Sequence, residues 1–317
     1  MEKGFYSFGT MNFLRVETAM PEAEKKAILA EAQALCARLD DMLSAFKPDS
    51  EISRVNRSAG RAPVAVSPDV FRLLRRAKDI SEASGNAFDI TIRPAAALWD
   101  IGHAGQRIPS YAERLETRRL VDWRLLELDE AAQTAFLRRR GQSIDLGGIA
   151  KGYAGDAVRE ALEARGVDSA LLNFGGTILT IGGRTDGSPW RVGIQNPLLG
   201  RGASVGSVPL TEGALVTSGV NERFFVRKGV RYHHLLDPRT CAPARSGVLS
   251  VTAAGANATD LDGYTTAFFV LGPEKGIALA ERTGLDVLYL TDDGRILATK
   301  GFADGKYRFT RNPARSA

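Results

Sequence analysis

Residues 143–156 are the stretch of this 317-residue chain whose residue types and spacing could bind a charged ligand. An alternating apolar strand ends at Asp145, and the pair Gly147 and Gly148 precedes a helical pattern that contains Lys151. Free N–H groups at a helix N-terminus, with a lysine beside them, suit a diphosphate, and glycines let a ligand approach bare backbone. An ordinary tight turn explains these residues about equally well. The spacing matches neither G-x-x-x-x-G-K-[ST] nor G-x-G-x-x-G, so neither nucleotide motif is present.

Two further pairs of polar residues have informative spacing. Asp262 and Thr266 lie four residues apart in a predicted helix over 259–271, so they share one helix face. A solvated helix carboxylate is the favoured interpretation of Asp262 on spacing alone. His233 and His234 are neighbours on a predicted strand over 231–236, where adjacent side chains point to opposite faces. Only one of these histidines can therefore face a given site.

The elements that must position these residues follow from periodicity and turn signals. Helical patterns cover 21–45, 68–84, 110–120, the stretch after Lys151 up to Gly166, 259–271 and 273–283. Strand patterns cover 5–17 with a break at Gly9-Thr10, a short segment after the turn 85–91, 123–146 as a hairpin, 169–173, 190–195, 215–219, 222–227 against 231–236, 248–253 and 285–291. Residues 44–56 read as a polar loop. This mixed order of hairpins and crossovers predicts an α+β fold rather than a doubly wound sheet.

Composition narrows the class of protein. The chain is 44% hydrophobic and 25% charged, which suffices for a large core. Its net charge of +5 favours an anionic ligand but is too diffuse to indicate nucleic acid. Its two cysteines form neither a metal motif nor a disulfide framework. The sequence predicts no membrane span and no signal peptide, so we expect a cytoplasmic protein, or a periplasmic one if the native precursor has a leader missing here.

Seven blocks of the sequence, in order, resemble the FAD:protein FMN transferases, the ApbE-type flavin transferases. The blocks are Ser44-x-Phe46-x-Pro48-x-Ser50-Glu51, Ala87-Phe88-Asp89, Asp145-x-Gly-Gly-Ile-Ala-Lys151-Gly-Tyr-Ala, Asn173-x-Gly175-Gly176, Thr217-Ser218-Gly219, His234-Leu-Leu-Asp237-Pro-Arg-Thr and Asp262-x-x-x-Thr266-Ala-Phe-Phe-Val-Leu-Gly272. The resemblance runs from about residue 9 to 272. It implies one domain over 1–317 with a T-fold-like mixed sheet and packed helices, a C-terminal helix, strand and hairpin over 273–307, and a basic tail over 308–317.

The resemblance implies a reaction and its cofactors. The family moves the FMN half of FAD onto a Thr or Ser hydroxyl of an acceptor protein, releases AMP, and needs Mg²⁺ at the pyrophosphate. Phosphoryl transfer mainly requires positioning and charge neutralisation, and a hard cation prefers oxygen ligands. The metal ligands carried over are the Asp262 carboxylate, the Thr266 hydroxyl and the main-chain carbonyl of Ala150. Partners expected are FAD and the acceptor protein, with no nucleic acid.

The resemblance also implies roles for the remaining site residues. His234 matches the histidine that acts as base toward the incoming hydroxyl, which suits a group that titrates near neutrality. Lys151 would lie beside the pyrophosphate, and Asp145 would hold the loop or a water molecule near it. The remaining FAD-binding positions are Phe46 beside the flavin, the adenine-side turn Ala87-Phe88-Asp89, and Gly219.

Three departures from the family pattern affect the site. Cys241 replaces a common Gly after Asp-Pro-Arg-Thr, Leu261 and Gly263 replace Ala on either side of Asp262, and Phe8 replaces a Met beside the flavin. No charged group is lost. Two other functions remain open on the residues: an FAD pyrophosphatase, in which water replaces the acceptor hydroxyl, and a protein that binds FAD without chemistry.

Overall fold

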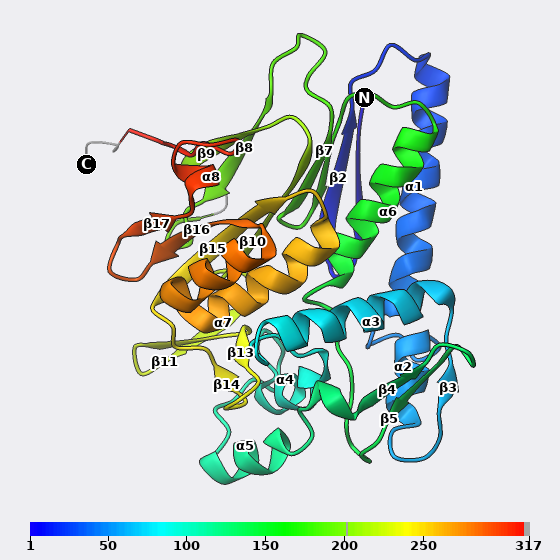
Figure 1. Cartoon of the computed structure of the whole chain (residues 1–317), viewed down its shortest axis with the longest axis vertical. Coiled ribbons are helices and arrows are strands. Elements are labelled where there is room, and N and C mark those ends of the chain that lie inside the picture. Colours follow the sequence, from blue (N-terminus) through cyan, green and yellow to red (C-terminus); the bar gives the residue numbers. More distant parts are fainter. Residues whose placement is uncertain (201, 314–317) are drawn as a thin grey trace.

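An eight-stranded sheet, antiparallel throughout, forms the centre of the molecule in the computed structural model, which describes residues 1–200 and 202–313 (Figure 1). Its strand order is β1-β2-β6-β7-β10-β15-β16-β17. The strands are β1 (Glu2–Ser7), β2 (Thr10–Val16), β6 (Ala170–Phe174), β7 (Thr177–Ile181), β10 (Gly213–Gly219), β15 (Val248–Gly255), β16 (Asp286–Thr291) and β17 (Ile296–Ala298). This arrangement confirms the predicted α+β class.

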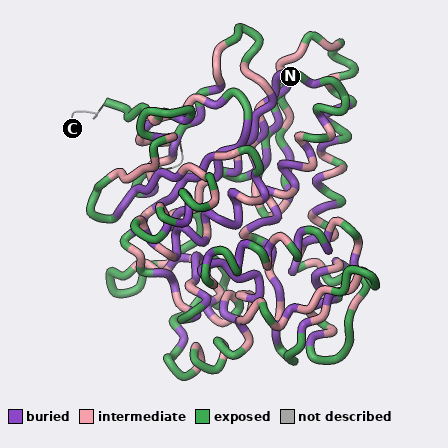
Figure 2. Tube along the Cα trace, in the orientation of Figure 1, coloured by how far each residue is buried: buried purple, intermediate pink, exposed green. Residues whose placement is uncertain are grey.

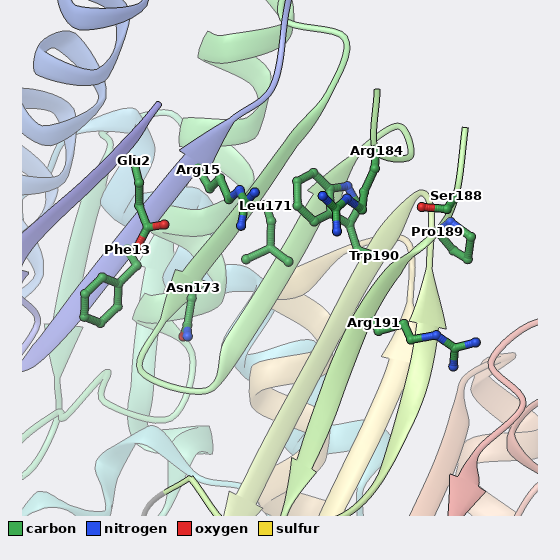
Figure 3. Close-up of a pocket in the computed structure, with 10 residues that line it drawn as sticks. All are labelled: Glu2, Phe13, Arg15, Leu171, Asn173, Arg184, Ser188, Pro189, Trp190 and Arg191. Carbon is green, nitrogen blue, oxygen red and sulfur yellow. The ribbon is translucent and has the colours of Figure 1, made fainter. Parts of the chain in front are cut away.

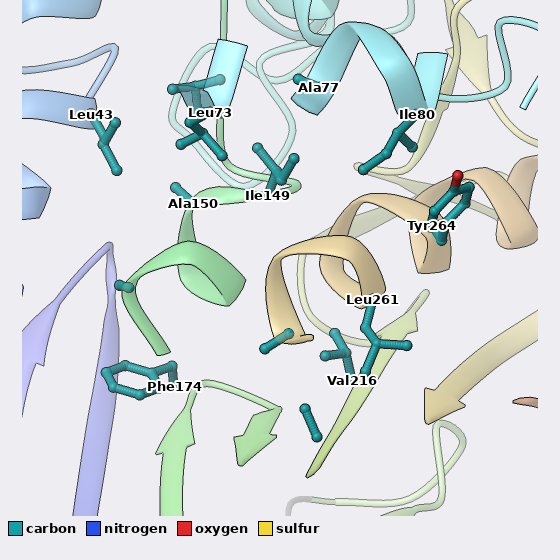
Figure 4. Close-up of a cluster of buried hydrophobic side chains, with 14 of the residues drawn as sticks. Leu43, Leu73, Ala77, Ile80, Ile149, Ala150, Phe174, Val216, Leu261 and Tyr264 are labelled. Atoms are coloured by element: carbon teal, nitrogen blue, oxygen red, sulfur yellow. The ribbon is translucent and has the colours of Figure 1, made fainter. Parts of the chain in front are cut away.

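Three helices cover one face of the sheet: α1 (Glu22–Leu43), α6 (Ala150–Ala164) and α7 (Ala258–Thr283). The alternate strand residues that face them, such as Leu14, Phe174 and Val216, join the main buried core (Figures 2 and 4). The two predicted helices at 259–271 and 273–283 are one element with a kink, because Gly272 has a left-handed φ of 78° and Pro273 follows it.

A smaller sheet of β8 (Trp190–Gln195), β9 (Ser204–Leu210) and β18 (Thr310–Arg311) covers part of the other face. Its inward residues, including Val192 and Val208, pack on Leu215 and Leu288 of the large sheet. Helix α8 (Lys300–Ala303) lies beside them. Part of the predicted basic tail is therefore a strand; residues 314–317 of that tail lie outside the described residues.

The other helices and short strands form a second layer below the sheet (Figure 1). They are α2 (Glu51–Arg57), α3 (Pro68–Ala83), the 3₁₀ turns Ile90–Ile92 and Trp123–Leu125, α4 (Arg93–Trp99), α5 (Tyr111–Arg118), the sheet β3-β5-β4 (Val64–Ala65, Thr134–Leu137, Leu126–Asp129), and the hairpins β11 (Phe224–Arg227) with β12 (Val230–His233) and β13 (Leu236–Asp237) with β14 (Ala242–Pro243). Among the described residues, none of the helices combines the length and the apolar character needed to cross a bilayer.

Three local predictions in the lower layer are wrong. The supposed polar loop contains helix α2, because the Ser50 hydroxyl accepts from Ser53 N at 2.9 Å and caps it. In place of the expected strand after 85–91, a 3₁₀ turn over Ile90–Ile92, capped by Asp89, leads into helix α4. The approach to Asp145 is extended but is not a strand, because the Asn56 side chain bonds both backbone groups of Ile144, at 2.6 and 2.9 Å.

Candidate functional site

The buried carboxylate of Asp262 lies where α6 and α7 cross, at the junction between the sheet layer and the lower layer. The two helices approach closely because a Cβ at Gly152 would lie 2.1 Å from the Ala258 carbonyl oxygen. A Cβ at Gly263 would lie 2.7 Å from Cδ1 of Ile80, so an alanine at this position would require the end of the Ile80 side chain to move. Gly263, where the family pattern has Ala, therefore lies at the contact of α7 with α3 (Figure 4 shows Ile80 facing this helix).

Asp262 accepts hydrogen bonds from two residues in the first turn of α6. Lys151 Nζ lies 3.3 Å from both Asp262 carboxylate oxygens, and Gly152 N donates to Oδ2 at 3.0 Å. The same ammonium donates to the Gly147 carbonyl oxygen at 3.0 Å. Asp262 is only 4% exposed. The oxygens of Asp262 and Gly147 therefore already surround one positive charge.

Thr266 lies on the same helix face as Asp262, one turn later, beside the glycine loop. A Cβ at Gly148 would lie 3.4 Å from Thr266 Oγ1 and 3.2 Å from the Phe88 ring. Gly148 thus keeps the loop backbone in contact with both side chains. Ala150 is buried and begins α6. The loop, Thr266 and Phe88 consequently share one site with Asp262.

The two histidines occupy different environments, although not by strand alternation. Strand β12 ends at His233, so the expected strand over 231–236 is shorter than predicted. His233 is buried, with Nε2 3.1 Å from the Ala244 carbonyl oxygen and its ring edge-on to Phe269. His234 follows in a bend and is partly exposed. The separation of their roles therefore comes from the end of the strand.

The orientation of the His234 ring favours Nε2 as the proton acceptor, whereas the surroundings of the ring lower its basicity. Its Nδ1 lies 3.2 Å from the Arg223 carbonyl oxygen, which can only accept, so Nδ1 carries the hydrogen and Nε2 is free to take a proton. Although part of the residue is exposed, the atoms packed around its ring desolvate it and lower the pKa of His234 to about 4, below the near-neutral value expected from the sequence. The hydrogen bond to the Arg223 carbonyl raises the pKa, and the charges of Arg223 and Lys151 lower it. His234 is neutral at pH 7 and close enough to Lys151 to feel its charge.

The turn Ala87-Phe88-Asp89 is built around the Asp89 carboxylate. Thr91 donates to Oδ1 through its backbone N at 2.8 Å and its hydroxyl at 2.7 Å, and Trp123 N donates to Oδ2 at 3.0 Å. Burial raises the pKa of Asp89 to about 6 despite these donors. Asp89 therefore shapes the turn, and Phe88 is the member of the turn that faces the loop.

Arg93, which the sequence analysis did not predict as a site residue, lies close to both Phe46 and Asp145. The Phe46 side chain is 68% exposed, and the Arg93 guanidinium lies 4.6 Å from the centre of its ring. Arg93 also lies 3.9 Å from the Asp145 carboxylate, whose Oδ1 accepts from Gly147 N at 2.8 Å. Arg93 is the second residue after the predicted turn 85–91, and its place before Pro94 gave no sign of a chemical role.

The remaining predicted positions lie at the edges of this group. Gly219 ends β10, and a side chain there would meet Asn221 Oδ1 at 2.7 Å. The Ser218 hydroxyl donates to Thr265 at 3.1 Å, which ties the end of β10 to α7 beside Thr266. Cys241 keeps a left-handed φ of 50°, the conformation that favours the glycine it replaces.

The available donors fit a hard cation better than a transition metal. In the described part of the chain, no group of three or more His, Cys, Asp or Glu could hold a metal ion. One carboxylate with a hydroxyl and main-chain carbonyls is an all-oxygen set, of the kind that Mg²⁺ completes with water and substrate phosphates. The Lys151 ammonium between Asp262 and Gly147 shows that these oxygens accept positive charge.

Comparisons with known proteins agree on one family. A model described as the ApbE family matches residues 8–289. A relative from Klebsiella pneumoniae, "FAD:protein FMN transferase", is 36% identical over 86% of this chain and 84% of its own length. One of the same description from Treponema pallidum is 37% identical over 93% and 86%.

Solved structures agree as well. The ApbE protein of Thermotoga maritima superposes with a TM-score of 0.88 at 30% identity, over 97% of this chain and 99% of its own. The apo flavinyl transferase ApbE of Pseudomonas stutzeri superposes with a TM-score of 0.85 at 31% identity, over 96% of each chain.

Proposed function

Because this chain belongs to the ApbE family, we propose that it transfers FMN from FAD to a Thr or Ser hydroxyl of an acceptor protein. In this reaction the acceptor oxygen forms a bond to the phosphorus on the FMN side of the diphosphate. The bond from that phosphorus to the bridging oxygen breaks, and AMP leaves. The proposal rests mainly on one observation. Oxygens of Asp262 and Gly147 surround the Lys151 ammonium, and His234 has its Nε2 free to accept a proton.

We assign proton acceptance, diphosphate binding and contact with FAD to different residues of the site. His234 Nε2 takes the hydroxyl proton, since its neighbours keep it neutral and fix its tautomer. Lys151 and the N-terminus of α6 bind the diphosphate. Phe46, Phe88 and Gly219 border the space for FAD, with Asp89 holding the turn and Asp145 the loop.

The metal part of the proposal concerns Mg²⁺ held by Asp262 and Thr266. The chemistry that a bound Mg²⁺ supplies here is neutralisation of charge on the diphosphate. The third protein ligand implied by the family is the Ala150 carbonyl, which lies in the first turn of α6. The Gly147 carbonyl is the alternative, because it already accepts from an ammonium.

The test is incubation of the protein with FAD, Mg²⁺ and candidate acceptor proteins, followed by mass spectrometry of each acceptor. Transfer predicts an acceptor heavier by one FMN less one water, with AMP released in equal amount. Release of AMP and free FMN while every acceptor keeps its mass would instead indicate an FAD pyrophosphatase. Absence of any FAD turnover would indicate an FAD-binding protein.

A further inference from the structure

On the face of the central sheet opposite helices α1, α6 and α7, strands β1 and β2 carry exposed side chains. The sheet β8-β9-β18 packs over β10 and β16 through Leu215 and Leu288. Strands β1 and β2 instead expose Tyr6, Met11 and Phe13 on that face, at 71, 47 and 42%. Tyr6 pairs with Met11 across the hairpin, and the Phe13 ring lies over Gly4. We call Tyr6, Met11 and Phe13 the hairpin strip.

A cavity of about 750 Å³ lies at one end of the hairpin strip (Figure 3). Glu2, Phe13, Arg15, Leu171 and Asn173 line it from the large sheet. The loop before β8 adds Arg184, Ser188 and Pro189, and β8 itself adds Trp190 and Arg191.

The cavity is cationic and has an aromatic wall. Three arginines and one glutamate line it. The guanidinium groups of Arg15 and Arg184 each lie 5.8 Å from the centre of the Trp190 ring. Glu17 lies 2.5 Å from Arg15 and 3.7 Å from Arg184, so one carboxylate serves two guanidinium groups. The remaining positive charge suits carboxylates on a ligand.

The other end of the hairpin strip reaches the candidate site. The hairpin turns at Phe8 and Gly9, both with left-handed φ, and a Cβ at Gly9 would lie 3.4 Å from the Arg223 guanidinium. The carbonyl of Arg223 accepts from His234 N at 3.1 Å. Gly9 and Arg15 are six strand residues apart, so about 20 Å separates the turn from the cavity at roughly 3.4 Å per residue.

We propose that the hairpin strip and the cavity dock an extended acidic segment of the acceptor protein, about six residues from the hydroxyl that receives FMN. The proposal rests on the proposed function. An extended segment with its hydroxyl at His234 covers the hairpin strip and places its carboxylates against Arg15 and Arg184. A second copy of the chain fits less well, since a two-fold contact would bring the same arginines together.

The probe is a fluorescent peptide of about 20 residues with one central Thr and three Asp about six residues away on each side, which follows from the strand spacing. Its control replaces every Asp by Lys. Binding is measured by anisotropy at about 0.1 M salt, where surface charges more than about 10 Å apart are largely screened. FMN transfer to its Thr is measured by mass spectrometry.

Arg184→Glu is expected to weaken binding of the Asp peptide by roughly tenfold or more, through like-charge repulsion. Phe13→Ala should weaken it less and tests the apolar part of the surface. Arg61→Glu is the matched control, since Arg61 is an exposed arginine of the lower layer. FAD affinity should be unchanged in all three variants.

Equal binding of both peptides, or equal binding by Arg184→Glu and the wild type, would overturn the docking surface. So would a wild-type dimer that Phe13→Asp dissociates, because the face would then be used for self-association. Selective binding of the Asp peptide without transfer of FMN to any acceptor would leave the surface standing as a binding site and overturn the proposed function.

Discussion

Two buried carboxylates at the contact of α6 with α7, Asp156 and Asp262, differ in the hydrogen-bond donors around them. Asp156 accepts from Ala258 N at 3.0 Å, from Thr259 N at 2.8 Å and Oγ1 at 2.7 Å, and from Arg159 at 2.9 Å. Asp262 receives one backbone donor and the long, flexible side chain of Lys151 at 3.3 Å.

The difference supports a structural role for Asp156 and the chemical role proposed for Asp262. Fixed donors saturate Asp156 and cap the start of α7, so its charge is neutralised within the fold. Asp262 keeps oxygens that a cation can share with Lys151, and it faces the glycine loop with Thr266. Two aspartates of similar burial thus differ in the donors around them, and this difference supports the role proposed for Asp262.

The sharpest test of this contrast is Asp262→Ala. Turnover of FAD should fall about a thousandfold or more, because the variant loses the anionic ligand proposed for Mg²⁺. The midpoint of thermal unfolding should change little. Turnover is measured by AMP release at saturating FAD and limiting Mg²⁺; near-normal release would place the metal elsewhere.

The second largest effect is expected at the histidines. His234→Ala should lower transfer roughly a hundredfold, the usual scale for loss of a general base, while His233→Ala stays near the wild type. FAD affinity should hold in both. Single-turnover labelling of an acceptor measures this, and a larger loss in His233→Ala would show that the base is misassigned.

Asp156→Asn should have the opposite effects to those expected for Asp262→Ala: lower stability with nearly unchanged turnover. Loss of the charged acceptor of four hydrogen bonds should cost about 2–4 kcal/mol of unfolding free energy. Turnover per folded molecule should stay within a few-fold of the wild type. Urea unfolding and FAD turnover, measured on the same samples, test this. Unchanged stability with lost turnover would contradict the structural role assigned to Asp156.

The last effect is on acid stability, where two opposing titrations partly cancel. Burial lowers the pKa of His233 to about 4 from an ordinary 6.5, so the unfolded chain gains a proton first as pH falls. His233 therefore costs stability progressively from about pH 6.5 to 4, by up to about 3 kcal/mol. Asp89 acts oppositely, since its raised pKa of about 6 favours the folded state on acidification.

Variants separate these two titrations. The loss of stability between pH 6.5 and 4.5 should be smaller in His233→Phe and larger in Asp89→Asn than in the wild type. Urea unfolding at each pH measures it. The same loss in all three proteins would show that neither group carries the pH dependence.

The sequence predicted the fold class and most strands, because alternation and turn residues are local signals. It missed helix α2, whose polar residues hide a cap at Ser50, and it extended the strand past His233. In the site, the resemblance selected Lys151, Asp262 and Thr266, which do lie together. Arg93 and Arg223 were missed, since their roles depend on contacts distant in sequence.

The most direct test of the central claim is calorimetric titration of Mg²⁺ into the FAD-bound protein, comparing wild type, Asp156→Asn and Asp262→Asn. We expect the wild type and Asp156→Asn to bind Mg²⁺ with similar affinity, and Asp262→Asn to bind it at least about tenfold more weakly, because the neutral amide is a poorer ligand. Equal affinity in Asp262→Asn, or a selective loss in Asp156→Asn, would contradict the assignment of the two carboxylates.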